Sequence, residues 1–480
     1  MTDSELVEGG TAERNFSMLE VSTPQAPARS PSKSVGRWFL FALLGWVTIW
    51  TVVMFVLFHP GLMSNDSLAQ LYEGITGEFT NAHPPLFALL LRVSFSISSS
   101  VWPVLLVQVA ALGVGIALLA SRQLHPAQAF AFTLLVTLCP PIWAILPTIW
   151  TDVFSVVALI WAVVSLAHRS RVWALIFLEL ATLIRHNAIL ASAPLLLLVV
   201  VSFPELRPSR WRKPVYVVLG LLVFMFSPKV VERLMQTSDV WLLGWIMADD
   251  LAGFYAEKPA EFVNSTFASE TSAAELAQLY SRHTAVPLLI LAPSRGLRGI
   301  DRSTLASRKH AVATEWLKMV VTEPFLYLKI RLRRSCTMLG LYPEPVYYPF
   351  HSTIDNNSYG LKLTSHTIAF RTMRKIETAV QNTILFRGWF WLILLLGVTA
   401  YALVRKGAMA VGFWVGVSGL VYMLGNFLFA PAADFRYLFW PIVSMFLAFA
   451  TLSCRLNQAP ATRGADDRER ELSATRKLSS

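Results

Sequence analysis

Ionisable side chains beside long apolar segments are the residues of this sequence best suited to chemistry. A carboxylate can accept a proton from a hydroxyl group, and a guanidinium group binds phosphate through paired hydrogen bonds. Ionisable residues at membrane depth are costly and usually have a function. The candidates, each at the boundary of an apolar segment, are Asp66, His83, Asp152, Arg185, His186, Asp434 and Arg436. The alternative is that these side chains only flank the apolar segments and contact water.

The first candidate lies in the most distinctive segment of the chain, residues 59–86, which read HPGLMSNDSLAQLYEGITGEFTNAHPPL. Asp66 follows the first apolar segment within a few residues. Residues 67–78 have a helical pattern, with apolar side chains on one side. His83 and two prolines then turn the chain into the apolar stretch 85–98, which we expect to lie as a helix at the membrane interface.

The composition predicts an all-α polytopic membrane protein. Of the 480 residues, 55% are hydrophobic and only 15% are charged, whereas soluble domains carry about 25% charged residues. Lipid offers no hydrogen bonds to the backbone, so the apolar blocks must be helices. We expect about ten spans, from the length that a bilayer requires, together with interfacial helices. The expected spans are 37–58, 101–120, 127–146, 153–167, 172–184, 188–203, 215–228, 389–404, 408–428 and 437–454.

The distribution of Lys and Arg predicts the orientation of the spans. Arg29, Lys33 and Arg37 precede the first span, whereas the loop 59–84 that follows it has no Lys or Arg. Basic residues recur in every second short loop, as the positive-inside rule requires of cytoplasmic loops. We therefore expect a multi-pass protein of the inner (plasma) membrane with both termini in the cytoplasm. All seven candidates then fall on the outer side.

The spans divide the chain into five parts. They are a disordered cytoplasmic tail, 1–36; an N-terminal transmembrane core, 37–228, whose first external loop is 59–84; a long polar stretch, 229–387, expected to be a mainly helical external domain; C-terminal transmembrane helices, 388–454; and a charged cytoplasmic tail, 455–480. Within the external domain, residues 316–332 have the pattern of an amphipathic helix resting on the membrane. This domain could recognise the acceptor, and its notable features are Asp249, Asp250 and the basic run 295–310. We interpret both features as solvated surface, with contact to anionic lipid head groups as the alternative for the basic run.

The same composition argues against a nucleic-acid partner, a disulfide framework and a zinc site. The formal net charge is +11, but most basic residues lie in short loops between spans and the sequence contains no nucleic-acid module. We therefore expect no nucleic-acid partner. The three cysteines are far apart in sequence, which predicts neither a disulfide framework nor a zinc site.

The first loop resembles the first external loop of the GT-C superfamily of membrane glycosyltransferases, and most closely that of bacterial relatives of the protein O-mannosyltransferases. The residues that carry the resemblance are Pro60 and Gly61, 64–67, Gln70, Gly74 or Gly77, and 81–84. Thr151 and Asp152 resemble the family's second acidic position, and residues 434–437, Asp-Phe-Arg-Tyr, resemble its last external loop. The resemblance covers about 37–230 and 389–454. It departs from the superfamily at Asp66, because the paired acid that is common there is missing.

The resemblance implies transfer of a hexosyl or pentosyl group from a polyprenyl-phosphate sugar to an envelope glycan, lipid or protein, with inversion. Asp66 would be the general base, and Asp152 would steer the acceptor, bind a cation or pair with Arg185. Arg185 and Arg436 would bind the donor phosphate. The remaining substrate-binding candidates are His83, His186, Asp434 and Tyr437. A capping or turn role stays open for each histidine. No cofactor is expected, but a divalent cation is not excluded.

Other functions fit the same sequence. A transporter or flippase for lipid-linked saccharides would also gather polar residues on spans, but near the bilayer midplane and often beside broken helices. A polysaccharide polymerase or ligase would share the topology and the large external stretch. A non-catalytic envelope assembly protein is a further alternative.

Overall fold

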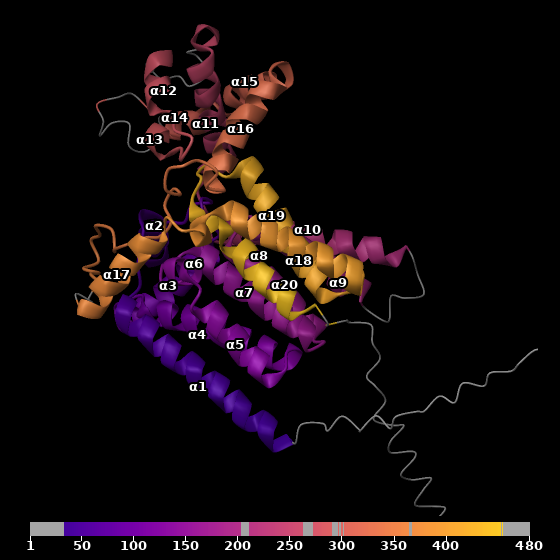
Figure 1. Ribbon diagram of the computed structural model, residues 1–480. Helices are drawn as coiled ribbons and strands as arrows, with labels where there is room; N and C mark the ends of the chain where they lie inside the picture. The colour runs from indigo at the N-terminus through magenta and orange to yellow at the C-terminus, as the bar shows by residue number, and fades with distance from the viewer. Residues whose placement is uncertain are drawn as a thin grey trace, which may run out of the picture.

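The computed structural model describes residues 33–202, 211–262, 272–289, 296, 299–300, 302–363, 367–452 and 454. Within these residues the chain forms helices and isolated bridges but no strand. The all-α class is therefore confirmed. Figure 1 shows a large helical bundle with a smaller group of helices, α11 to α16, standing at one end; we call this group the head.

Five helices are long and apolar enough to cross a membrane, which is consistent with a multi-pass membrane protein. They are α1 (Lys33–Phe58), whose apolar window starts at Trp38, α4 (Trp102–Gln123), α10 (Arg212–Leu234), α18 (Gly388–Lys406) and α19 (Val411–Phe429). Large apolar side chains on these helices remain exposed, among them Ile49 and Val56 on α1 and Phe226 on α10. Exposing such a surface to water is unfavourable, whereas the lipid of a bilayer would cover it.

The other expected spans correspond to shorter helices, so ten spans remain a prediction. They are α5 (Pro126–Thr137), α7 (Thr151–Ala167), α8 (Arg171–Ile184), α9 (Ala188–Val201), and η6 (Phe435–Leu438) followed by α20 (Phe439–Ala450). The expected span 127–146 is interrupted: α5 ends at Thr137 and α6 (Pro140–Ile145) follows. Pro140 and Pro141 explain the break, because proline has no amide hydrogen with which to continue a helix.

Helix α7 occupies the centre of the bundle and positions the residues at its first turn. Nearly all of its side chains are buried, and it packs against α4, α8 and α20. Gly115 on α4 allows a close approach, since a Cβ atom there would lie 2.7 Å from Ile160 Cγ2. The first turn of α7, with Thr151 and Asp152, is thereby held in the middle of one end of the bundle.

Two short helices lie at that same end. Helix α2 (Asn65–Thr76) begins two residues before the expected start, and α3 (Pro85–Ser98) has the expected bounds. Gly74 lets them pack closely, because a Cβ atom on it would lie 2.3 Å from the Ala88 carbonyl oxygen. Gly77, with a φ of +78°, ends α2 in the left-handed conformation that glycine adopts most readily. We call this end of the bundle the site-bearing end.

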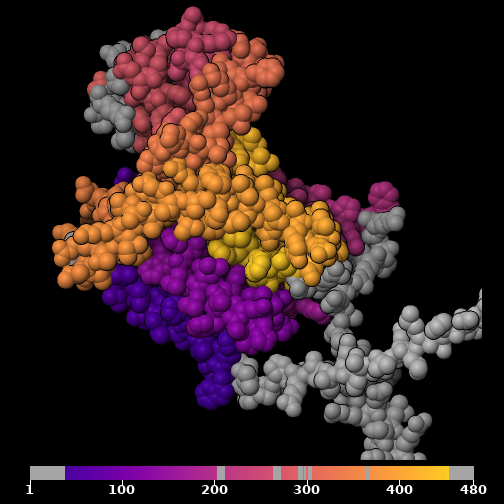
Figure 2. All heavy atoms as spheres, in the orientation of Figure 1, coloured from indigo at the N-terminus to yellow at the C-terminus, as the bar shows by residue number. Residues whose placement is uncertain are grey.

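The stretch 229–387 contributes to two hydrophobic cores. The head has a core of its own, built around residues such as Leu251 and Tyr255. Its helices are α11 (Leu242–Glu257), η2 (Pro259–Glu261), α12 (Ala273–Leu279), α13 (Val286–Leu289), α14 (Arg302–Ser307), α15 (Lys309–Thr322) and α16 (Pro324–Met338). Residues after α16, with α17 (Ile368–Val380) and η5 (Ile384–Phe386), pack on the bundle core instead. Figure 2 shows this orange segment lying between the head and the N-terminal helices.

Asp249 and Asp250 are not solvated surface, and that interpretation was wrong. Both are fully buried in α11, where Asp249 pairs with Arg334 and Asp250 pairs with Arg331, the latter with an oxygen–nitrogen distance of 2.5 Å. The physical reason is that α16 brings two arginines, three residues apart, to the same side of the helix. Of the basic run 295–310, residues 295, 297–298 and 301 lie outside the described residues.

Candidate functional site

Most of the predicted site residues meet at the site-bearing end. Asp66 lies in the first turn of α2 and Asp152 in the first turn of α7. Arg185 directly follows α8, while Asp434 and Arg436 lie at the start of η6. Each helix therefore contributes the residue at its own end, which explains how segments separated by hundreds of residues form one cluster.

Arg436 holds two carboxylates at once. Its Nη2 atom lies 2.9 Å from Asp66 Oδ2, and its Nε atom lies 3.0 Å from Asp434 Oδ2. A second ion pair is adjacent, with Arg185 Nη1 lying 2.7 Å from Asp152 Oδ2. Arg185 Nη1 also donates a hydrogen bond of 3.0 Å to the Thr151 hydroxyl. Three carboxylates and two guanidinium groups thus form one network.

Aromatic rings hold the two guanidinium groups in place. The Arg436 guanidinium lies 4.8 Å from the Trp150 ring centre and 5.5 Å from that of Tyr437. The Arg185 guanidinium lies 5.6 Å from the same Tyr437 ring, at distances where a cation is attracted to a ring face. The Trp150 indole in turn donates a 2.8 Å hydrogen bond to the Ser64 hydroxyl. Tyr437 therefore links the two halves of the network.

The carboxylates differ in exposure and in charge. The side chain of Asp66 is 44% exposed, against 9% for Asp434 and 2% for Asp152. Burial is the largest single influence on the pKa of Asp66 and raises it, but Arg436, His83 and Arg185 together lower it by more, so the net pKa lies below its ordinary value. Burial raises the pKa of Asp434 to about 6. Asp66 is thus the solvent-open anion of the site.

The two histidines occupy different surroundings. Burial lowers the pKa of His83 to about 4, so its ring is neutral at ordinary pH, and the charges that act on it include Asp66, Arg185 and Arg436. His186 Nε2 lies 3.4 Å from an oxygen of Glu232 on α10. His83 therefore belongs to the cluster, whereas His186 pairs with a neighbouring acid.

Glu232 was missed at the sequence level. Its side chain is 8% exposed and also accepts a 2.9 Å hydrogen bond from the Lys229 ammonium group. The signal that could have found it is an acid in the last turns of a long apolar helix, because a charge in that position needs a partner.

A segment with neither a helical nor a strand period also lies against the site. Phe435 N donates to the Tyr347 carbonyl at 3.2 Å, and Met63 exchanges backbone hydrogen bonds with Thr353 and Asp355 at 3.2 and 2.9 Å. Residues 347–355 therefore contact both the α2 and the η6 sides of the network.

Two side chains of this segment fix its shape. The Tyr348 hydroxyl lies 2.5 Å from His351 Nδ1, and His351 Nε2 lies 3.0 Å from the Met63 carbonyl oxygen. The Tyr348 ring packs against Trp150 with ring centres 6.1 Å apart. Tyr348 has a φ of +50°, a conformation that is unusual for a bulky residue and that clusters at functional sites. The run of aromatic residues at 347–351 was the available signal.

Among the residues that the structure describes, no group of three or more His, Cys, Asp or Glu side chains is arranged to hold a metal ion. Each acid of the network faces an arginine instead. The positive charges of this network are the guanidinium groups of Arg185 and Arg436.

Comparison with known proteins returns no match to a family model, a curated protein or a solved structure.

Proposed function

We propose that the chain is a membrane glycosyltransferase that moves a sugar from a polyprenyl-phosphate donor to an envelope acceptor. The observation that carries the proposal is the network at the site-bearing end, in which a solvent-open carboxylate, Asp66, lies beside the guanidinium groups of Arg436 and Arg185. A general base beside two phosphate-binding groups is what this transfer requires.

The proposed reaction is a single displacement. The acceptor hydroxyl oxygen attacks the anomeric carbon, the bond from that carbon to the phosphate oxygen breaks, and polyprenyl phosphate leaves. The hydroxyl proton passes to Asp66, and attack opposite the departing phosphate inverts the configuration. Arg436 and Arg185 stabilise the phosphate, whose charge grows as the bond breaks. Neutral His83 and Tyr437 offer hydrogen bonds to the sugar.

Donor binding would also activate the base. Arg436 is paired with Asp66 and Asp434, so an incoming phosphate competes with both carboxylates for the same donors. Once the phosphate holds Arg436, Asp66 loses an ion-pair partner and becomes a better proton acceptor. The site would therefore acquire its base only when the donor is bound.

An apolar groove beside the network suits the donor's lipid chain. Its volume is about 250 Å³, and it lies between α4, α7 and α8, with Ala111, Phe154, Trp161 and Leu180 among its lining residues. Phe154 follows Asp152 by two residues and Leu180 precedes Arg185 by five. The groove therefore starts within about two helical turns of the ion pair, as a chain attached to the bound phosphate requires.

The charge distribution supports an outward-facing site in the inner (plasma) membrane. α4 and α18 carry basic residues in their last turns, and α8 and α10 begin with arginine, all at the ends opposite the network. By the positive-inside rule those ends face the cytoplasm. Both termini would then be cytoplasmic, and lipid-linked sugar and acceptor would meet at the outer surface.

A transport assay separates this proposal from a flippase. The purified protein is placed in lipid vesicles with a radiolabelled polyprenyl-phosphate sugar and an envelope extract. A transferase releases free polyprenyl phosphate and labels the acceptor, while a flippase moves the intact lipid across the bilayer. Intact donor after full translocation would refute the proposal. Labelled glycan chains that lengthen on the lipid carrier itself would favour a polymerase.

A further inference from the structure

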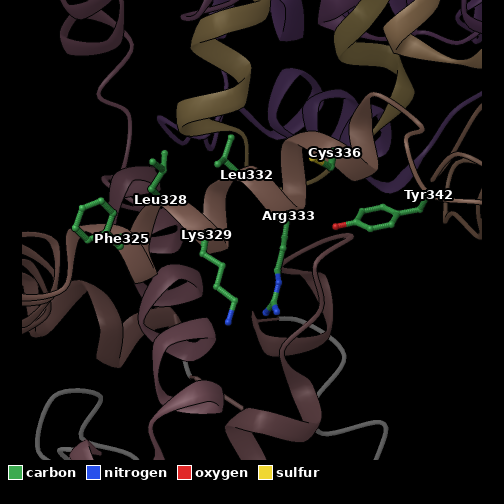
Figure 3. A pocket seen from close by; sticks show the side chains of 7 residues that line it. All are labelled: Phe325, Leu328, Lys329, Leu332, Arg333, Cys336 and Tyr342. Carbon is green, nitrogen blue, oxygen red and sulfur yellow. The ribbon is translucent and has the colours of Figure 1, made fainter.

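One helix of the head exposes an apolar face that no described part of the chain covers. On α16, Phe325, Leu328 and Leu332 are 86%, 47% and 51% exposed. Their spacing of three and four residues places them on one side of the helix. They line a shallow depression of about 280 Å³ together with Lys329, Arg333, Cys336 and Tyr342 (Figure 3).

The other side of α16 is fixed by the protein itself. Arg331 and Arg334 are buried and pair with the two aspartates of α11. The Ser335 hydroxyl donates to the Phe427 carbonyl at 3.4 Å, and Arg331 Nη1 donates to the Ala430 carbonyl at 3.2 Å. Helix α16 therefore lies across the end of α19, and its exposed face cannot rotate inward.

The exposed face continues the apolar surface of α19. That helix is long and apolar enough to cross a membrane, and near its end Leu424, Leu428 and Phe429 are 56%, 39% and 53% exposed. In Figure 3, Leu328 and Leu332 point to the side on which the end of α19 lies. The exposed apolar side chains of α19 and of α16 therefore form one continuous surface, with no polar side chain among those named.

The two charged side chains that line the depression lie along its edge nearest the rest of the head. Lys329 and Arg333 point away from α19, toward the rest of the head (Figure 3). Both pair with Glu257, Lys329 with a nitrogen–oxygen distance of 2.9 Å. A helix with its apolar side chains toward the membrane and its cations on the water side has the arrangement of an interfacial helix.

We propose that α16 is an interfacial helix whose apolar face sits in the lipid leaflet at the site-bearing end, so that its partner is the phospholipid surface. The continuity with α19 selects lipid over a soluble protein, because lipid that covers Leu428 also reaches Leu328 and Leu332. The head is tied to the last loop as well, through Ala285 N to Pro431 O at 3.0 Å and Ala433 N to His283 O at 2.7 Å. Anchoring α16 in lipid therefore holds the head at a fixed height over the candidate site.

Spin-label depth measurements on the full chain test this proposal. The native cysteines Cys139, Cys336 and Cys454 are replaced by alanine, and single cysteines at 325, 328 and 332 carry a nitroxide in phospholipid nanodiscs. Positions 261 and 318 serve as controls, because the Glu261 and Lys318 side chains are 52% and 63% exposed on the head. Labels in lipid collide with oxygen more than with a water-soluble nickel chelate.

The expected result is an oxygen-to-nickel collision ratio at 325, 328 and 332 at least several-fold higher than at 261 and 318. Doxyl-labelled lipids should broaden the same three signals and leave the controls unchanged. Nickel collisions equal to those of the controls would overturn the proposal, since the face would then lie in water. Protection from both oxygen and nickel would overturn it too, because a protein partner or a second copy would then cover α16.

Discussion

Arg436 connects more groups of the candidate site than any other residue described above. Its guanidinium group contacts Asp66, Asp434 and two aromatic rings. The planar group therefore has a partner on several sides. Lysine offers a point charge on a flexible stem and cannot reproduce this arrangement. The residue's shape, and not only its charge, should therefore determine donor binding.

Replacing Arg436 or Arg185 with lysine should weaken donor binding while the protein stays folded. Loss of one charge-assisted hydrogen bond costs about 1.5–3 kcal/mol, which corresponds to roughly a tenfold to hundredfold rise in the dissociation constant. Binding of a polyprenyl-phosphate sugar to the purified variants measures this. Arg371→Lys on α17, an exposed arginine, is the matched control. Wild-type affinity in both site variants would remove the phosphate-binding assignment.

Donor affinity should also depend on pH through Asp434. Its pKa is raised by burial to about 6, so the side chain is neutral below that pH and becomes an anion as the pH rises through it. The donor phosphodiester is singly charged throughout this range, and a new carboxylate beside it repels it. The dissociation constant should therefore rise between about pH 5 and 7. Asp434→Asn should bind tightly across that range, and an unchanged pH profile in this variant would contradict the assignment.

At the scale of elements, α11 and α16 are joined by charges rather than by apolar side chains alone. Asp250 accepts hydrogen bonds from Arg331 and from the Trp316 indole at 2.5 and 2.9 Å. A buried ion pair adds little compared with apolar packing, but loss of one partner leaves an uncompensated charge. The stability of the head therefore depends on both members of the pair. Arg331 also donates a hydrogen bond to the Ala430 carbonyl in the last loop.

Asp250→Asn should destabilise the head by about 3–5 kcal/mol, because Arg331 would remain buried without its carboxylate. Thermal unfolding in detergent and amide hydrogen exchange in α11 measure the loss. Adding Arg331→Met should recover most of it. Glu261→Gln is the control, because its partner Lys258 is 3.2 Å away on the surface and such pairs contribute about 0–1 kcal/mol. Equal stability of Asp250→Asn and the control would show that the pair does not support the head.

At the scale of the whole molecule, the outward-facing site depends on the orientation of the bundle. Reporter fusions after residues 75, 150, 300 and 432 should report the external side, because all four lie at or beyond the site-bearing end. Fusions after 123, 170, 210 and 406 should report the cytoplasm, as expected from the basic loops. A cytoplasmic signal after residue 300 would invert the orientation and place the site on the wrong face for an external acceptor.

Hydropathy and loop charge predicted the part of the architecture that depends on local sequence. Because alternate ends of successive apolar helices share a side, the convergence of Asp66, Asp152 and Arg436 could be expected. The pairing of each arginine with its carboxylate depends on helix packing angles, which no local pattern encodes. Residues 347–355 have no helical or strand period, so their contact with the site was not predictable. The burial of Asp249 was missed because its partner lies 85 residues away.

The side chain of Asp66 has a defined alternative to the role of base. It could have capped α2, but the residue before the helix is Ser64, and Asp66 instead pairs with Arg436. Its structural role is therefore an ion pair, which Asp66→Asn would weaken. Loss of the pair alone should free Arg436 for phosphate and leave donor binding as tight as in the wild type or tighter. Loss of the base should stop transfer.

The most direct test of the account is to measure transfer and donor binding together in purified Asp66→Asn. The amide keeps the size of the side chain but cannot take a proton, and loss of general-base assistance typically costs about a hundredfold to ten-thousandfold in rate. We predict a loss of that size in sugar transfer from a polyprenyl-phosphate donor, with donor affinity equal to or above that of the wild type. The loss of stability should stay within the range of about 0–1 kcal/mol that a partly exposed ion pair contributes. Near-normal transfer by Asp66→Asn would contradict the central claim that this carboxylate is the base of a glycosyl transfer.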